Sequence, residues 1–165
     1  MTIRKAEQKD VDRINEIHNQ AILERFKVAD LTPWTREKRL KNFQERNHDE
    51  YPIFVAEIDG IVVGYANINP YRPDRMAVRQ TAEISCFIDN TFRAGGVGKT
   101  LMNFLETESV KLGIKTLFAI IIDNNVASVK MVENLGYEKW GLLPNVAEFD
   151  GVEVGHLYYG KRIKK

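Results

Sequence analysis

The sequence has one cysteine, Cys86, among its 165 residues. One cysteine cannot form an internal disulfide, and it is too few for a zinc site built from several thiolates. No apolar run approaches the ~20 residues that a membrane span needs, so no membrane partner is expected. The N-terminal stretch MTIRKAEQKD is polar and unlike a signal peptide, which predicts a soluble, cytoplasmic protein.

Net charge is also nearly absent. The 24 Lys and Arg residues offset the 23 Asp and Glu residues, leaving a charge of +1, so no basic excess marks a nucleic-acid partner. The composition, 44% hydrophobic and 28% charged, is that of an ordinary globular protein. The length suits one domain with a buried core, and we expect a single domain over residues 1–165.

The spacing of apolar residues predicts the order β-α-α-β-β-β-α-β-α-β-β, a mixed α/β domain. The clearest hairpin has Asp59-Gly60 as its turn, between apolar runs at 53–58 and 61–68. Thr35 is the expected N-cap of the second helix. The other expected elements are strands at 2–5, 81–88, 116–122, 137–143 and 151–163, joined at the end by turns at Pro144-Asn145 and Asp150-Gly151, and helices near 11–22, 36–46, 97–112 and 126–135.

The most informative stretch is 81–100, TAEISCFIDNTFRAGGVGKT. It predicts a strand, a short turn and a Gly-rich loop that opens a helix. The unpaired N–H groups and the positive dipole end of such a helix favour an anion, most often phosphate. A P-loop would need glycine at Arg93, and a dinucleotide-binding loop would need glycine at Leu101, so neither motif fits. A plain turn remains the alternative interpretation.

The spacing that does fit is R-x-x-G-x-G, from Arg93 through Gly96 to Gly98. It resembles the acyl-CoA pyrophosphate loop of the GNAT superfamily of N-acetyltransferases. Further parts of that family's pattern follow in order: the strand at 116–122, then N-x-A-S from Asn125, ending in Leu135-Gly136-Tyr137. The resemblance implies a central, mostly antiparallel twisted sheet with a parallel splayed pair at the acyl-CoA site, flanked by about four helices. It also implies acetyl-CoA as co-substrate and no metal.

Within that superfamily the chain is similar to the phosphinothricin and methionine sulfoximine N-acetyltransferase group. The residues that carry this similarity are Pro70-Tyr71-Arg72, Thr81-Ala82-Glu83 and Asn125-x-Ala127-Ser128. The similarity implies acetylation of the amine of a small, amino-acid-like molecule by a homodimer. Two features depart from the pattern. Val132 stands where the family often has a Tyr or His that protonates the leaving thiolate, and the stretch 152–156 lacks the group's usual tryptophan.

The resemblance also suggests which residues hold acetyl-CoA. The N–H groups of 94–99 would cradle the pyrophosphate, and the strand at 86–88 would pair with the pantetheine arm as an added strand does. One N–H group of that strand could also polarise the thioester carbonyl. The candidates are Cys86, Phe87, Ile88, Arg93, Ala94, Gly95, Gly96, Val97, Gly98, Lys99, Asn125 and Ser128.

Glu83 is the candidate catalytic base. Strand alternation puts Glu83, Ser85 and Phe87 on one face, and Ile84, Cys86 and Ile88 on the apolar one. A carboxylate in a half-buried cleft has a raised pKa and can take a proton directly or through water. The other interpretation is a surface glutamate at an edge. Candidate substrate-binding residues, besides Glu83 and Ser85, are Tyr71 as a wall and Arg72 and Arg75 as carboxylate ligands.

Three other interpretations stay open. Cys86 as a nucleophile is disfavoured, because it lies on the apolar face with no histidine paired to it. A protein or peptide N-acetyltransferase would need an open groove. A domain that binds acyl-CoA as a sensor, without catalysis, would explain Val132 but not the intact Glu83.

Overall fold

The computed structural model describes residues 1–164. In this range the strands are β1 (Thr2–Lys5), β2 (Ile53–Ile58), β3 (Ile61–Pro70), β4 (Thr81–Ile88), β5 (Thr116–Ile122), β6 (Glu138–Phe149) and β7 (Val152–Arg162). The α-helices are α1 (Val11–Leu23), α2 (Arg36–Gln44), α3 (Val97–Lys111) and α4 (Val126–Asn134). The predicted mixed α/β class is confirmed.

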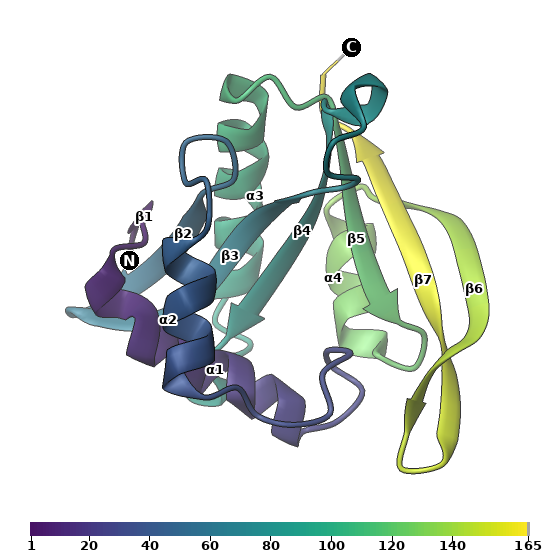
Figure 1. Cartoon of the computed structure of the whole chain (residues 1–165), viewed down its shortest axis with the longest axis horizontal. Helices are drawn as coiled ribbons and strands as arrows, with labels where there is room; N and C mark the ends of the chain where they lie inside the picture. Colours follow the sequence, from purple (N-terminus) through teal and green to yellow (C-terminus); the bar gives the residue numbers. More distant parts are fainter. Residues whose placement is uncertain (165) are drawn as a thin grey trace.

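Across residues 1–164 the strands form one seven-stranded sheet in the order β1-β2-β3-β4-β5-β7-β6. All neighbouring strands of this sheet are antiparallel except β4 and β5, which are parallel. The predicted combination of a mostly antiparallel sheet with one parallel pair is therefore confirmed. That pair lies at the centre of the sheet (Figure 1).

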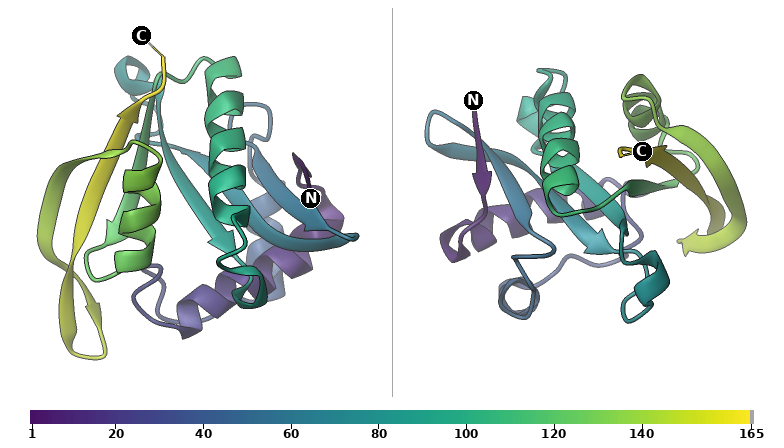
Figure 2. Two further views of the ribbon diagram at one scale, coloured as in Figure 1. Left: turned by 180° about the vertical axis from the view of Figure 1, so that it is seen from behind. Right: turned by 90° about the horizontal axis from the view of Figure 1, so that it is seen from above.

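Helices cover both faces of the sheet. α1 and α2 lie on one face, and α3 and α4 lie on the other (Figures 1 and 2). The larger core cluster lies under α3 and α4 and includes Ile84, Leu101, Leu105 and Leu117, all 3% exposed or less. A second cluster, with Ile14, Val55 and Tyr65, lies under α1 and α2. The alternating side chains of β4 thus serve two cores.

The parallel pair is short. β4 and β5 are paired only at Thr81 with Thr116, Ala82 with Leu117, and Glu83 with Phe118. Beyond these positions the strands diverge, as Figure 1 shows. The last five residues of β4 and the last four of β5 therefore leave backbone edges that face each other across a gap.

The end of the chain differs from its predicted course. β6 does not stop at 143 but continues through Pro144 and Asn145 to Phe149, with a register shift between Leu143 and Ala147. The shift is possible because β6 is the last strand of the sheet, where a proline removes no hydrogen bond that the sheet needs. The single turn is at Asp150-Gly151. No helix within residues 1–164 is long and apolar enough to cross a membrane.

Candidate active site

A cavity of about 420 Å³, called here the outer cavity, lies between the end of β4, the Gly-rich loop and the start of α4. All but one of the predicted acyl-CoA residues line it. They are Cys86, Phe87, Ile88, Arg93, Ala94, Gly96, Val97, Gly98, Lys99, Asn125 and Ser128. Gly95 belongs to the same loop but does not line the cavity.

The Gly-rich loop has the backbone shape of an anion site. Ala94 and Gly96 take left-handed conformations, with φ of 66° and 78°. Gly96 is the N-cap of α3, where no side chain accepts the first N–H groups of the helix. The residues that carry these N–H groups line the cavity, so the start of the helix can bind phosphate there. A Cβ on Gly98 would lie 3.2 Å from Met131 Sδ, a tight contact with a flexible side chain. The residues present therefore fit a CoA pyrophosphate.

Two side chains add charge near the loop. Arg93 forms an ion pair of 2.8 Å with Glu24, so much of its charge is already compensated. Lys99 is exposed on the first turn of α3. The backbone of the loop, together with Lys99 on the first turn of α3, is therefore suited to bind an anion.

Asp89 fixes the position where β4 ends and the loop begins. Its carboxylate, only 3% exposed, accepts hydrogen bonds from Arg13, Gln20 and Thr91, the first at 2.6 Å. Burial acts to raise the pKa of Asp89, but these hydrogen bonds outweigh it and hold the pKa well below its usual range. The end of β4 is thereby tied to α1.

A second cavity of about 200 Å³, the inner cavity, fills the gap between the diverging ends of β4 and β5. It shares Lys27, Cys86, Phe87, Asn125, Ser128 and Met131 with the outer cavity, so the two join end to end. The free backbone edge of β4 runs along both. An extended pantetheine arm can pair with that edge, with its thioester reaching the inner cavity.

Glu83 lines the inner cavity at the last paired position of β4. It is half-buried, and burial raises the pKa of its carboxyl group. No ion pair or hydrogen bond to this carboxylate is found within residues 1–164. The carboxylate is therefore free to accept a proton.

The other predicted residues of β4 alternate as expected. Ser85 lines the inner cavity, and Phe87 packs on the α1 side. Cys86 packs against the core under α3, and burial raises the pKa of its thiol to about 12. Such a thiol is not ionised at neutral pH, which argues against a nucleophilic role.

The start of α4 forms one wall of both cavities. Asn125 is 3% exposed, and its Oδ1 accepts from the N–H of Ser128 at 3.4 Å, as an N-cap does. Val132 lines the inner cavity and has no group that can give a proton. The departure noted in the sequence therefore lies on the wall of the inner cavity.

The predicted substrate-binding residues of the loop after β3 lie at two different places. Tyr71 lies against Phe118, with ring centroids 5.1 Å apart, and Phe118 is the β5 partner of Glu83. Arg72 and Arg75 instead line a separate hollow of about 580 Å³, which shares no residue with the inner cavity. The structure thus brings Tyr71 beside Glu83, but not the two arginines.

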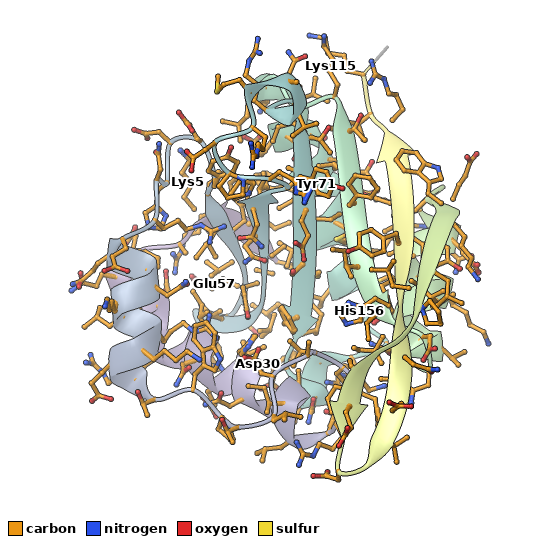
Figure 3. The ribbon with its side chains drawn as sticks, turned by 45° about the vertical axis from the view of Figure 1, so that its right-hand side comes forward. Lys5, Asp30, Glu57, Tyr71, Lys115 and His156 are labelled. Atoms are coloured by element: carbon orange, nitrogen blue, oxygen red, sulfur yellow. The ribbon has the colours of Figure 1, made fainter. Side chains whose placement is uncertain are left out.

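Three residues of the inner cavity and its surroundings were not predicted. His156 of β7 and Lys27, from the segment after α1, line the inner cavity. Trp140 packs edge-on against Phe118 at 5.3 Å. Figure 3 shows His156 and Tyr71 around the gap between β4 and β5, with Asp30 across from His156. Within residues 1–164 no three His, Cys, Asp or Glu side chains gather as metal ligands would.

Comparison with known proteins agrees with this geometry. The Bacillus subtilis protein YwnH is 36% identical over 152 residues, covering 92% of each chain. The L-methionine sulfoximine/L-methionine sulfone acetyltransferase of Salmonella typhimurium is 30% identical, covering 94% of this chain and 88% of the relative.

A crystal structure of a phosphinothricin acetyltransferase from Sinorhizobium meliloti, in complex with acetyl-CoA, superposes with a TM-score of 0.91. It is 26% identical and covers 98% of this chain and 87% of its own. The sequence model of the acetyltransferase (GNAT) family matches residues 14–137. The chain therefore belongs to the GNAT family, as an N-acetyltransferase that uses acetyl-CoA.

Proposed function

We propose that the enzyme transfers the acetyl group directly from acetyl-CoA to the amine of a small, amino-acid-like acceptor, with Glu83 as the base. The observation that carries this proposal is the position of Glu83. It is half-buried, free of partners among the described residues, and located where β4 and β5 part. The acceptors named for the Salmonella relative, methionine sulfoximine and methionine sulfone, are of this class.

The chemistry follows from the residues around the joined cavities. Glu83 takes a proton from the acceptor's ammonium group, directly or through one water, and its raised pKa suits it to that task. A free N–H group of β4 near residues 86–88 polarises the thioester carbonyl. The amine nitrogen then forms the new bond to the carbonyl carbon and loses its second proton to water. The bond from carbon to sulfur breaks, and its electron pair stays on sulfur.

One buried and one half-buried arginine support an acceptor that carries a negative charge. Arg39 is 7% exposed, and its Nη2 has no hydrogen-bond partner in the part of the chain described. Arg46 donates to Asn69 Oδ1 at 2.8 Å, and Asn69 is the β3 partner of Glu83. Burial lowers the pKa of both groups, to about 10 for Arg46. Neither arginine lines the inner cavity, so a carboxylate of the acceptor would have to extend past Glu83 on its β3 side to compensate this charge, in the role first predicted for Arg72 and Arg75.

We also propose that the enzyme works in the cytoplasm as a homodimer. β6 is an edge strand, and four of its apolar side chains, Trp140, Leu142, Leu143 and Val146, are 45–52% exposed. An exposed apolar edge strand is a ready surface for pairing with another chain. A second copy of the chain is the partner that the relationship to the phosphinothricin group suggests.

An assay of CoA release tests the proposed reaction. The purified protein is given acetyl-CoA with free amino acids, phosphinothricin, methionine sulfoximine, polyamines or short peptides in turn. Wild type and Glu83→Gln are compared, because the amide keeps the size of the side chain but cannot take the proton. We expect release with amino-acid analogues and a loss of about 100-fold or more in Glu83→Gln.

The other possible results of this assay would each indicate a different function. Release with peptides alone would indicate a protein or peptide N-acetyltransferase. No release with any amine, while acetyl-CoA still protects the protein against heat, would indicate a sensor of acyl-CoA. Full activity of Glu83→Gln would remove Glu83 as the base.

A further inference from the structure

The junction of the outer and inner cavities is where the sulfur of the thioester must lie. The phosphates belong at the Gly-rich loop of the outer cavity, and the acetyl group belongs beside Glu83 in the inner one. The six residues common to both cavities therefore surround the place where the leaving sulfur gains its electron pair. Among them Lys27 alone carries a charge at neutral pH, since burial keeps the Cys86 thiol protonated.

Lys27 is held at this junction by the segment 24–30, called here the bridging segment. It leaves α1 and passes across the open end of the gap between β4 and β5 (Figure 1). On the far side Arg25 forms an ion pair of 2.9 Å with Asp150, and Phe26 packs against Phe149 with ring centroids 4.8 Å apart. The bridging segment thereby connects α1 with the turn between β6 and β7.

The backbone of the bridging segment is strained just before Lys27. Arg25 and Phe26 have φ of 58° and 55°, which is uncommon for residues other than glycine. Strain of this kind persists where the surroundings impose it, and it gathers at functional sites. Here it turns the chain so that Lys27 Nζ lies 3.3 Å from Asn125 Oδ1, on the opposite wall.

The other candidates for a charge at the sulfur are poorly placed. Arg93 and Lys99 line the outer cavity only, and Arg93 is paired with Glu24. His156 lines the inner cavity only. Val132, which replaces the family's usual proton donor, is apolar. Among the described residues, Lys27 is thus the one cationic side chain that lines both cavities, and so lies at their junction.

Resting on the proposed function, we propose that Lys27 is a catalytic residue whose ammonium group stabilises the leaving CoA thiolate. When the bond from carbon to sulfur breaks, the electron pair stays on sulfur, and the Lys27 charge lies beside it. Lys27 need not give up its own proton, because the thiolate can be protonated later from water. This arrangement supplies by electrostatics what a tyrosine or histidine at position 132 would supply by proton transfer.

The test measures the bound thiol itself rather than turnover. CoA is bound to the protein, and the ultraviolet absorbance of its thiolate is followed as the pH is raised, with desulfo-CoA as the blank. A cation within a few ångströms lowers the pKa of an ionisable group by roughly 1–3 units. Ionisation of Cys86, with a pKa of about 12, lies at higher pH than that of the bound thiol.

Three variants separate charge from structure. Lys27→Gln loses the charge but keeps a donor for Asn125 Oδ1, whereas Lys27→Arg keeps the charge. Lys130→Gln removes a charge from the exposed face of α4 and serves as the control. We expect the thiol pKa to rise by about one unit or more in Lys27→Gln. It should stay near the wild-type value in Lys27→Arg and Lys130→Gln. With acetyl-CoA, kcat should fall about tenfold or more in Lys27→Gln, with little change in KM.

Equal thiol pKa values in wild type and Lys27→Gln would overturn the proposal, as would equal pKa rises in Lys27→Gln and Lys27→Arg. The second result would mean that Lys27 only ties the bridging segment to α4. A wild-type protein that binds no CoA would instead refute the proposed function. The two failures are therefore distinguishable. A bound-thiol pKa in wild type that is no lower than that of free CoA would also overturn the proposal, and this readout does not depend on the folding of any variant.

Discussion

At the scale of single residues, the burial of Glu83, the proposed base, carries a cost in stability. Its carboxyl pKa is raised in the folded protein by burial, and no compensating partner is found within residues 1–164. The stability that Glu83 contributes is therefore fully present below its ordinary pKa of 4.5 and is lost as the pH rises through the folded-state value. A neutral side chain avoids that loss.

We accordingly expect Glu83→Gln to be more stable than wild type at neutral pH. The gain should be no more than about 1 kcal/mol, because water still reaches the carboxylate. The difference should vanish as the pH falls below 4.5. Urea unfolding at both pH values measures it, with the exposed Glu138→Gln as control. A destabilised Glu83→Gln would show that Glu83 has a stabilising partner.

In wild type, kcat/KM should fall as the pH falls, because the protonated Glu83 carboxyl group cannot act as a base.

At the scale of elements, the entrance of α3 and the body of α4 approach each other across the outer cavity. Gly98 permits this approach, since its built Cβ would meet Met131 Sδ at 3.2 Å and Ile88 Cγ1 at 3.6 Å. A branched side chain at position 98 would occupy space that the pantetheine or pyrophosphate needs. The loop around it would keep its backbone, because Gly98 does not have a positive φ.

We expect Gly98→Val to fold but to bind acetyl-CoA poorly. A ligand at 100 times its Kd stabilises a protein by ~2.7 kcal/mol, which is about 5–10 °C in Tm for a chain of this size. Thermal unfolding with and without acetyl-CoA should show that shift in wild type and little of it in Gly98→Val. Gly141→Val is the control, because a Cβ there meets no atom within 4 Å. An unchanged shift in Gly98→Val would place the ligand elsewhere.

Elements whose residues carry their own pattern were predictable. β4 alternates polar and apolar residues, and the Gly-rich loop has three glycines before a helix, so the wall of the outer cavity could be recognised from local sequence. β6 could not, since Pro144 ends a strand by its local chemistry, and only the edge position in the sheet tolerates it. Lys27 was hidden for a related reason. It lies in a stretch without periodicity, and its role depends on contacts with Asn125, 98 positions away.

At the scale of the whole molecule, the exposed side of β6 is long enough to join two chains. Its 12 residues span roughly 35–40 Å at the rise of an extended strand. A specific interface needs about 800 Å² from each partner, and the apolar side chains along β6 give such an area a hydrophobic centre. A charge placed there would have to be buried without a partner on dimerisation, which is costly.

We therefore expect the wild-type chain to sediment as a dimer and Val146→Lys to sediment as a monomer. The variant should keep its circular dichroism spectrum, because Val146 is 52% exposed in the isolated chain and the lysine stays in water there. Ile61→Lys, a matched change of an apolar residue that is 53% exposed on the far hairpin, should remain dimeric. A monomeric wild type at all concentrations, or a dimeric Val146→Lys, would rule out β6 as the interface.

Losing the dimer should also weaken binding of the acceptor, because Trp140 of β6 packs against Phe118, the β5 partner of Glu83. In Val146→Lys we expect a higher KM for the amine and little change in the KM for acetyl-CoA.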